Sequence, residues 1–378
     1  MLFFLFVLLV MMAVTNSRSR CLAIFIWLFL IFVYSFGKTE GDYEIYQWIY
    51  SSFRTGEVTI ALSTFEPGFA ALMWLCSILG LPFVAFRFIV SAFISFSLYN
   101  LFKKQTEDVA LATVLYGVFP FFVWSAAMRS GMAVVFVSFA FQEFIDNDLK
   151  KSLKSLILFL IAILFHYSSV FFLVFFLSFC RNRKIRNGKF LVILLGIFVL
   201  TILLYFTDIP VRFVSMVTDN KKVTQWLYKG EGTANLTGIL AEVAILMLLY
   251  LLSKKNFDYC QLLNVCGASH STIRGVEVLY RLSTFCFLLL PFIALASPFM
   301  RIPYMMLALS IPMTLSCDSI MANERKDGEM YRRNVIYLRR IWIEMLLILL
   351  ALKLYYDLPY LKAGQMFFSE FTQWSLAC

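Results

Sequence analysis

Three side chains that carry or can carry a positive charge lie inside strongly apolar stretches. Arg129 lies in FFVWSAAMRSGMAVVF, where no other charge occurs between Asp108 and Glu143. His166 separates ILFLIAILF from SSVFFLVFF, and Arg301 lies in SPFMRIPYMM. Ionisable groups are costly in apolar surroundings, so each of the three is a candidate for function.

The arginines point to an anion site. A guanidinium offers a planar fork of donors that fits phosphate oxygens bidentately, and Gly131 would let a ligand approach the chain beside Arg129. The alternative for Arg129 is a structural arginine at a helix end. Arg87, between LPFVAF and FIVSAF, is a further embedded arginine. We expect it to pair with Glu66 or to reach the same anion site.

His166 has two open interpretations. An imidazole titrates near neutral pH, so it could donate to a diphosphate or act as a base. Ser168 and Ser169 begin the next short helix, whose N-terminal amides could add to an anion site. The alternative is a histidine that is satisfied within the core.

Three carboxylates complete the candidate chemistry. Asp42 and Glu44 begin a polar loop, and Glu66 begins the segment EPGF. A carboxylate at this level could deprotonate a hydroxyl or hold a cation. The alternative is that they are ordinary solvated loop carboxylates.

The composition indicates that lipid surrounds these residues. Of 378 residues, 61% are apolar and only 15% are charged, against about 25% charged in soluble domains. The apolar stretches are nearly continuous, so we expect one membrane domain over 1–378 and no soluble module. The net charge of +10 comes from short basic clusters between apolar runs. Membrane topology explains such clusters, and nucleic-acid binding is not expected.

The sequence predicts an all-α polytopic membrane protein of about 11–13 apolar helices, including short broken or re-entrant ones. The eight cysteines show no CxxC spacing, so neither a metal site nor a disulfide framework is expected, and no cofactor is expected. We expect apolar helices near 2–16, 21–36, 66–80, 82–102, 109–128, 130–145, 155–165, 168–180, 190–206, 236–252, 276–296, 299–318 and 341–356.

The basic clusters fix an expected orientation, because Lys and Arg concentrate on the cytoplasmic side. The clusters are Arg18/Arg20, Lys103/Lys104, Lys150/Lys151/Lys154, Arg181 to Lys189, Lys254/Lys255, and Arg325 to Arg340. Outer loops near 37–65 and 207–235, and turns near Arg129, His166 and Arg301, then face the other side.

The number of membrane crossings agrees with this assignment of sides only under two conditions. Segment 66–80 must not cross the membrane, and 155–165 and 168–180 must be short helices that meet at His166. Broken helices are tolerated where they line a cavity. We therefore expect a cavity that enters the membrane from outside. The aromatic segment 42–53, DYEIYQWIYSSF, is expected to be an interfacial helix beside it.

At this point the motifs resemble those of a known family. GDYEIYQWIY, FEPGF, AAMRSGMA, LFHYSSV and RIPYMM occur in this order, as in the EpsG/Wzy class of repeat-unit polymerases, which make bacterial O-antigens, capsules and exopolysaccharides. The similarity runs from about residue 40 to 310. The family commonly has Arg-Gln where this chain has Arg129-Ser130. The resemblance implies a GT-C-like fold with an outward-facing site in the inner membrane, and undecaprenyl-diphosphate-linked donor and acceptor.

Carried onto this chain, the resemblance implies that Arg129, His166 and Arg301 grip the donor diphosphate, with Arg87 as a further candidate. Asp42 is then the preferred general base, with Glu44, Glu66 or His166 as substitutes. The glycan moves from its lipid diphosphate to a lipid-linked acceptor. No nucleotide sugar is needed, in keeping with the lack of a Rossmann fingerprint. The resemblance also implies a separate chain-length partner.

Two other functions remain open. A ligase that moves the glycan onto lipid A characteristically has a large outer loop late in the chain, whereas 207–235 is modest. A flippase or transporter commonly has paired halves with symmetric broken helices, and no such halves are evident. Both features favour a polymerase.

Overall fold

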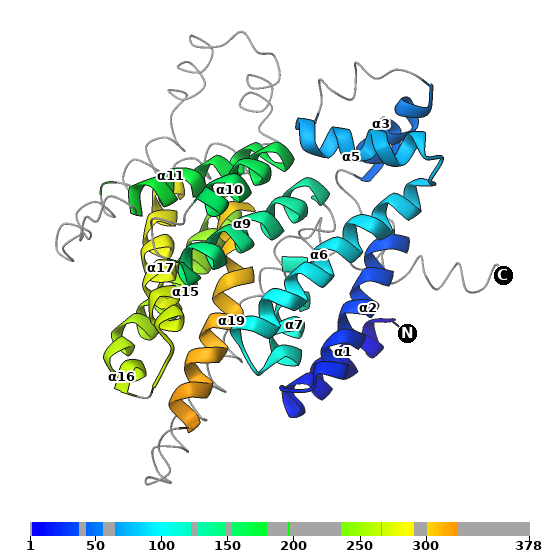
Figure 1. Ribbon diagram of the computed structural model, residues 1–378. Helices are drawn as coiled ribbons and strands as arrows, with labels where there is room; N and C mark the ends of the chain where they lie inside the picture. The colour runs from blue at the N-terminus through cyan, green and yellow to red at the C-terminus, as the bar shows by residue number, and fades with distance from the viewer. Residues whose placement is uncertain are drawn as a thin grey trace.

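The computed structural model describes residues 2–37, 43–55, 65–118, 120–121, 127–147, 153–179, 196, 236–265, 267–290 and 301–323. Every regular element in these ranges is a helix (Figure 1). Helices satisfy their backbone hydrogen bonds internally, as a bilayer requires. The all-α expectation is confirmed.

The described helices occur in the following order along the chain. In the first half they are α1 (Leu2–Thr15), α2 (Arg20–Phe36), α3 (Tyr43–Thr55), α5 (Pro67–Ile78), α6 (Phe83–Gln105), α7 (Val109–Val118), α9 (Met128–Asp146) and α10 (Leu153–Phe165). After the 3₁₀ helix η2 (Tyr167–Ser169) come α11 (Val170–Phe179), α15 (Leu236–Asp258), α16 (Cys260–Val265), α17 (His270–Cys286), η3 (Phe287–Leu289) and α19 (Arg301–Asn323).

Some helix ends differ from the expected ones. The helix expected over 276–296 begins six residues earlier because Ser269 caps it, its hydroxyl accepting the amide of Thr272 at 3.1 Å. Met128 begins α9, so Arg129 lies in the first turn of a helix rather than in a turn between helices. The expected helices 190–206, apart from residue 196, and 341–356 lie outside the described residues.

The surface confirms that lipid is the surrounding medium. Large apolar side chains at helical spacing stay exposed on α2 (Phe25, Leu28, Phe32, Phe36) and on α6 (Phe88, Ile89, Phe93, Phe96). Soluble proteins rarely expose such contiguous apolar patches. Among the described helices, α6 and α9 are long and apolar enough to cross a bilayer. The chain is a membrane protein.

Helix α9 is the centre of the packing. Helix α10 lies along it, and α6, α17 and α19 contact its other sides. Helix α2 packs between α6 and α7, where the ring of Trp27 lies 6.0 Å from Phe102 and 5.9 Å from Tyr116. These layers bury α9 and leave the outer faces of α2 and α6 to lipid.

Helix α5 is short for a membrane crossing. Its 12 residues extend about 18 Å at about 1.5 Å per residue, well short of a core of about 30 Å. It ends at Ile78, and Gly80 in the following turn has a φ of 73°, the left-handed conformation that glycine adopts freely. Tyr50 and Arg54 of α3 donate to the carbonyl of Leu81 and so hold α3 against this turn. Figure 1 shows α3 and α5 together at the end where α2 finishes and α6 begins.

The basic clusters gather at the opposite end. Arg18, Arg20, Lys103 and Lys104 line one cavity between the α1–α2 turn and the end of α6. Lys104 also pairs with Asp146 at the end of α9. Two short helices, α10 and α11, meet at the turn beginning with His166, as the sequence predicted. That this basic end faces the cytoplasm stays a prediction of the sequence.

We expect a cysteine at position 44 to face outside and one at position 103 to face the cytoplasm, because α3 and the end of α6 lie at opposite ends. Both side chains are exposed. In a variant lacking the eight native cysteines, an impermeant maleimide applied to intact cells should label Glu44→Cys and not Lys103→Cys. Permeabilised cells, in which both should react, are the control. Labelling of position 103 from outside would reverse the orientation.

Candidate active site

Glu66 joins the two central candidates of the sequence. Its Oε2 accepts from Nη1 of Arg129 at 2.6 Å, and its Oε1 lies 3.0 Å from Nδ1 of His166. The backbone N–H of Tyr167 also donates to Oε1, at 3.4 Å. The Glu66 side chain is only 5% exposed. One buried carboxylate therefore connects α5, α9 and the α10–α11 turn.

The segment EPGF explains how Glu66 reaches this position. Pro67 occupies the first turn of α5, where proline is preorganised and lacks only an amide that has no helical partner. Gly68 lies directly against α10, since a Cβ on it would come within 2.9 Å of the carbonyl oxygen of Leu164. This close approach of α5 and α10 brings Glu66 beside His166.

Arg129 is oriented by the aromatic helix α3. Its Nε donates to Oη of Tyr46 at 3.2 Å, and its guanidinium carbon lies 4.8 Å from the ring centre of Phe65. Cations over aromatic faces are attracted by the ring quadrupole. The Arg129 side chain remains 19% exposed, more than the carboxylate it binds. It is thus fixed in direction while keeping access to the solvent side.

The charges around Glu66 keep it ionised. Burial alone would raise its pKa, but the hydrogen bond from His166 and the charge of Arg129 outweigh burial and lower the pKa of Glu66 to about 2. Glu66 and His166 both lie in turns, outside α6 and α9, the two described helices that are long and apolar enough to cross a bilayer. The carboxylate is therefore an acceptor only, and the proton in the contact with His166 is on Nδ1.

His166 is consequently a neutral imidazole with a defined tautomer. Burial lowers its pKa against the opposing effect of Glu66, and the positive charge of Arg301 adds to the lowering. With the proton on Nδ1, the lone pair is on Nε2. Among the described residues Nε2 has no hydrogen-bond partner, and neither do the hydroxyls of Ser168 and Ser169 in the same turn. The turn thus offers a base and two hydroxyls to a polar ligand.

Arg301 also belongs to this region. It begins α19, and its charge is close enough to His166 to disfavour protonation of the imidazole. Glu66 therefore joins Arg129 to His166, and the positive charge of Arg301 acts on His166. Within the described ranges no group of three or more His, Cys, Asp and Glu side chains has a metal-binding arrangement.

Arg87 does not pair with Glu66, which was one of its two expected positions. Its guanidinium donates to the carbonyl of Gly37 and lies 5.4 Å and 4.8 Å from the ring centres of Tyr34 and Tyr43. It is buried and makes no described contact with Glu66, whose two oxygens are occupied by Arg129 and His166. Arg87 therefore joins α2, α3 and α6 to one another.

Of the other candidate carboxylates, Glu44 is not part of the cluster: it is exposed on α3 without a described ion pair. Asp42 lies outside the described residues. Sequence reasoning missed Tyr46 as the partner of Arg129. Its spacing with Ile49, Tyr50 and Phe53 gives one buried face of α3, and that periodicity was the available signal.

One comparison with known proteins found a match. Residues 18–338 match the model of the EpsG family. This range includes every described member of the cluster. No curated protein and no solved structure matches the chain.

We expect Gly68→Ala to separate Glu66 from His166, because the added methyl would overlap the backbone of α10. Overpacking of this kind costs about 1–3 kcal/mol, so the apparent Tm of the purified protein should fall. Ala71→Ser, which adds one atom at an exposed position of the same helix, is the matched control. Equal Tm values for the two variants would contradict the close approach of α5 and α10.

Proposed function

Because the chain belongs to the EpsG family, we propose that it is a polysaccharide polymerase of the O-antigen or capsule type. It transfers a growing glycan from undecaprenyl diphosphate to a lipid-linked repeat unit at the outer face of the inner membrane. Its fold is GT-C-like in this proposal. The observation that carries it is the Glu66–Arg129–His166 cluster, in which a neutral imidazole and fixed cations meet.

The charge of the cluster suits a diphosphate leaving group. Arg129 lies in the cluster and the positive charge of Arg301 acts on His166, so two cations flank a neutral imidazole in this proposal. Preorganised cations stabilise the negative charge that develops on a leaving diphosphate. Arg129 needs no reorientation, because Tyr46 and Glu66 already hold it.

His166 is the general base in this proposal. Glu66 holds Nδ1–H, so Nε2 can take a proton, in the way that a carboxylate orients the imidazole of a catalytic triad. Glu66 itself is a poor base, because its pKa is about 2 and both of its oxygens are bound.

The proposed reaction balances without a further reactant. The acceptor hydroxyl oxygen attacks the anomeric carbon of the donor sugar, and its proton moves to Nε2 of His166. The bond between the anomeric carbon and the diphosphate oxygen breaks. Undecaprenyl diphosphate leaves with the electron pair, and Arg129 and Arg301 stabilise its charge.

The distribution of charge supports an outward-facing site. The cluster belongs to α5, to the turn before α11 and to the start of α9, whereas the basic side chains near Arg18 and Lys103 lie at the other end of α6. By the positive-inside rule the basic end is cytoplasmic. Lipid-linked oligosaccharide, an inner-membrane location and a chain-length partner remain parts of the proposal.

We expect Arg129→Ala and His166→Ala each to reduce polymerisation by about 10²–10⁴-fold, the range for a lost general base or charge-stabilising donor. The assay incubates purified protein with lipid-linked repeat units alone and resolves the glycan ladder on a gel. Arg281→Ala removes another Arg–Glu pair, with Glu277, away from the cluster, and should leave the ladder intact.

A ladder from both cluster variants at the wild-type rate would contradict the site. Absence of a ladder from the intact wild-type protein with its correct repeat unit would contradict the polymerase itself. Transfer of the glycan to lipid A instead would identify a ligase.

We expect the rate to fall about tenfold per pH unit on the acid side, because protonation removes the lone pair of His166. The midpoint should lie below the ordinary histidine value of about 6.5, since burial lowers the pKa of His166. Glu66→Gln removes the charge that raises this pKa, so the midpoint should move further down and the plateau should fall. The pH profile of kcat/KM measures both. An unchanged midpoint in Glu66→Gln would exclude His166 as the base.

A further inference from the structure

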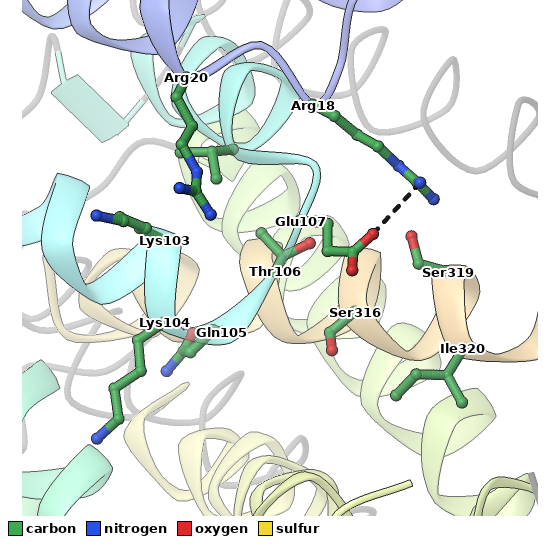
Figure 2. Close-up of a pocket in the computed structure, with 11 residues that line it drawn as sticks. Arg18, Arg20, Lys103, Lys104, Gln105, Thr106, Glu107, Ser316, Ser319 and Ile320 are labelled. Atoms are coloured by element: carbon green, nitrogen blue, oxygen red, sulfur yellow. Dashed lines mark ion pairs between the residues drawn. The ribbon is translucent and has the colours of Figure 1, made fainter. Parts of the chain in front are cut away.

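A basic cavity lies at the end of the molecule opposite the Glu66 cluster. It has a volume of about 440 Å³ and is formed by the α1–α2 turn, the end of α6, the α6–α7 link and α19 (Figure 2). Four of its lining side chains are cationic: Arg18, Arg20, Lys103 and Lys104. This size lies in the range of small-ligand sites.

Two of these four charges are already compensated. Arg18 lies 3.3 Å from Glu107 and 4.0 Å from the buried Asp108, and Lys104 pairs with Asp146. Arg20 and Lys103 have no ionic partner in the part of the chain that the structure describes. Figure 2 shows the Arg18–Glu107 pair on one side of the cavity and the two lysines on the other. The positive charges of Arg20 and Lys103 line the same cavity, and like charges that share a cavity favour an anion bound between them.

The cavity is rigid because its walls are joined by one buried carboxylate. Asp108 accepts from the hydroxyl of Ser17 at 2.6 Å and from that of Ser319 at 2.7 Å. The amide of Ala110 donates to the carbonyl of Ser17 at 2.9 Å. These bonds tie the α1–α2 turn, the start of α7 and α19 together. Arg20 and Lys103 are therefore presented by fixed helix ends, Arg20 from the start of α2 and Lys103 from the last turn of α6.

The cavity lies at the end of a helix that is long and apolar enough to cross a bilayer. A crossing by α6 would bring its last turn, and with it the cavity, to the level of lipid headgroups. Basic pockets between transmembrane helices on the cytoplasmic side bind phosphate-bearing headgroups. The Ser316 hydroxyl in the lining offers a further donor to phosphate oxygens.

We propose that this cavity is a phosphate-binding site, with Arg20 and Lys103 as its principal cationic ligands. The phosphate is supplied either by the headgroup of an anionic phospholipid or by a soluble phosphate compound. The site is separate from the proposed transfer reaction, and bound phosphate would connect the start of α2 to the end of α6 from the cytoplasmic surface.

The test measures binding to the full-length protein in phosphatidylcholine nanodiscs with increasing phosphatidylglycerol, and in detergent with inorganic phosphate or pyrophosphate. The variant is Arg20→Gln combined with Lys103→Gln. The matched control is Lys154→Gln combined with Lys254→Gln, which removes two exposed positive charges elsewhere. Retained phosphatidylglycerol is counted by native mass spectrometry, and the shift in apparent Tm is recorded with each ligand.

We expect the Arg20/Lys103 variant to bind at least about tenfold more weakly than the wild type and the control. If only the Arg20/Lys103 variant loses binding of phosphatidylglycerol, the ligand is a lipid headgroup. If only this variant loses binding of soluble pyrophosphate, the ligand is a soluble phosphate compound. Both results support the site. Equal binding by wild type and both variants, or equal losses in the two variants, would overturn it. Arg20→Lys combined with Lys103→Arg keeps both charges, and its restored binding would separate charge loss from misfolding.

Discussion

The arrangement of α5, α9 and the α10–α11 turn depends on one interaction, the buried and ionised carboxylate of Glu66 with its partners. An ionised carboxylate is expensive to remove from water, so it persists only where opposite charge and hydrogen-bond donors surround it. Arg129 and His166 supply them from two other segments of the chain, at 2.6 Å and 3.0 Å. Because Glu66 needs these partners, α5, α9 and the α10–α11 turn meet at its carboxylate.

A buried ion pair of this kind adds little net stability, because desolvation offsets much of the attraction. Its effect is on geometry. The pair fixes the direction of the Arg129 guanidinium and the tautomer of His166, while the packing of Gly68 against Leu164 keeps the segments in register. Short helices such as α5 and α10 make this possible, because a full crossing would carry the ends of both helices away from the shared turn.

The sequence predicted the helical class and the apolar segments, and it named Arg129, His166 and Arg301 as candidates for one site. Hydropathy and charge clusters report burial and sidedness directly, so these predictions needed no knowledge of packing. The partner of Glu66 was not predictable in the same way. Arg87 and Arg129 both lie in apolar segments, so hydropathy does not distinguish a pairing of Glu66 with Arg87 from one with Arg129. Only the direction of each helix face decides that Arg129 meets Glu66 while Arg87 meets Tyr34 and Tyr43.

Helix α3 resolves this choice between the two arginines. Its Tyr43 lies over the guanidinium of Arg87, and its Tyr46, one helical turn later, accepts from Nε of Arg129. Residues three apart share a face of a helix, so both tyrosines project inward while Glu44 remains in solvent. Arg87 has aromatic faces and a carbonyl in place of a carboxylate, and Glu66 pairs with Arg129. The aromatic segment thus does more than mark the interface: it divides two buried cations between a structural position and the candidate active site.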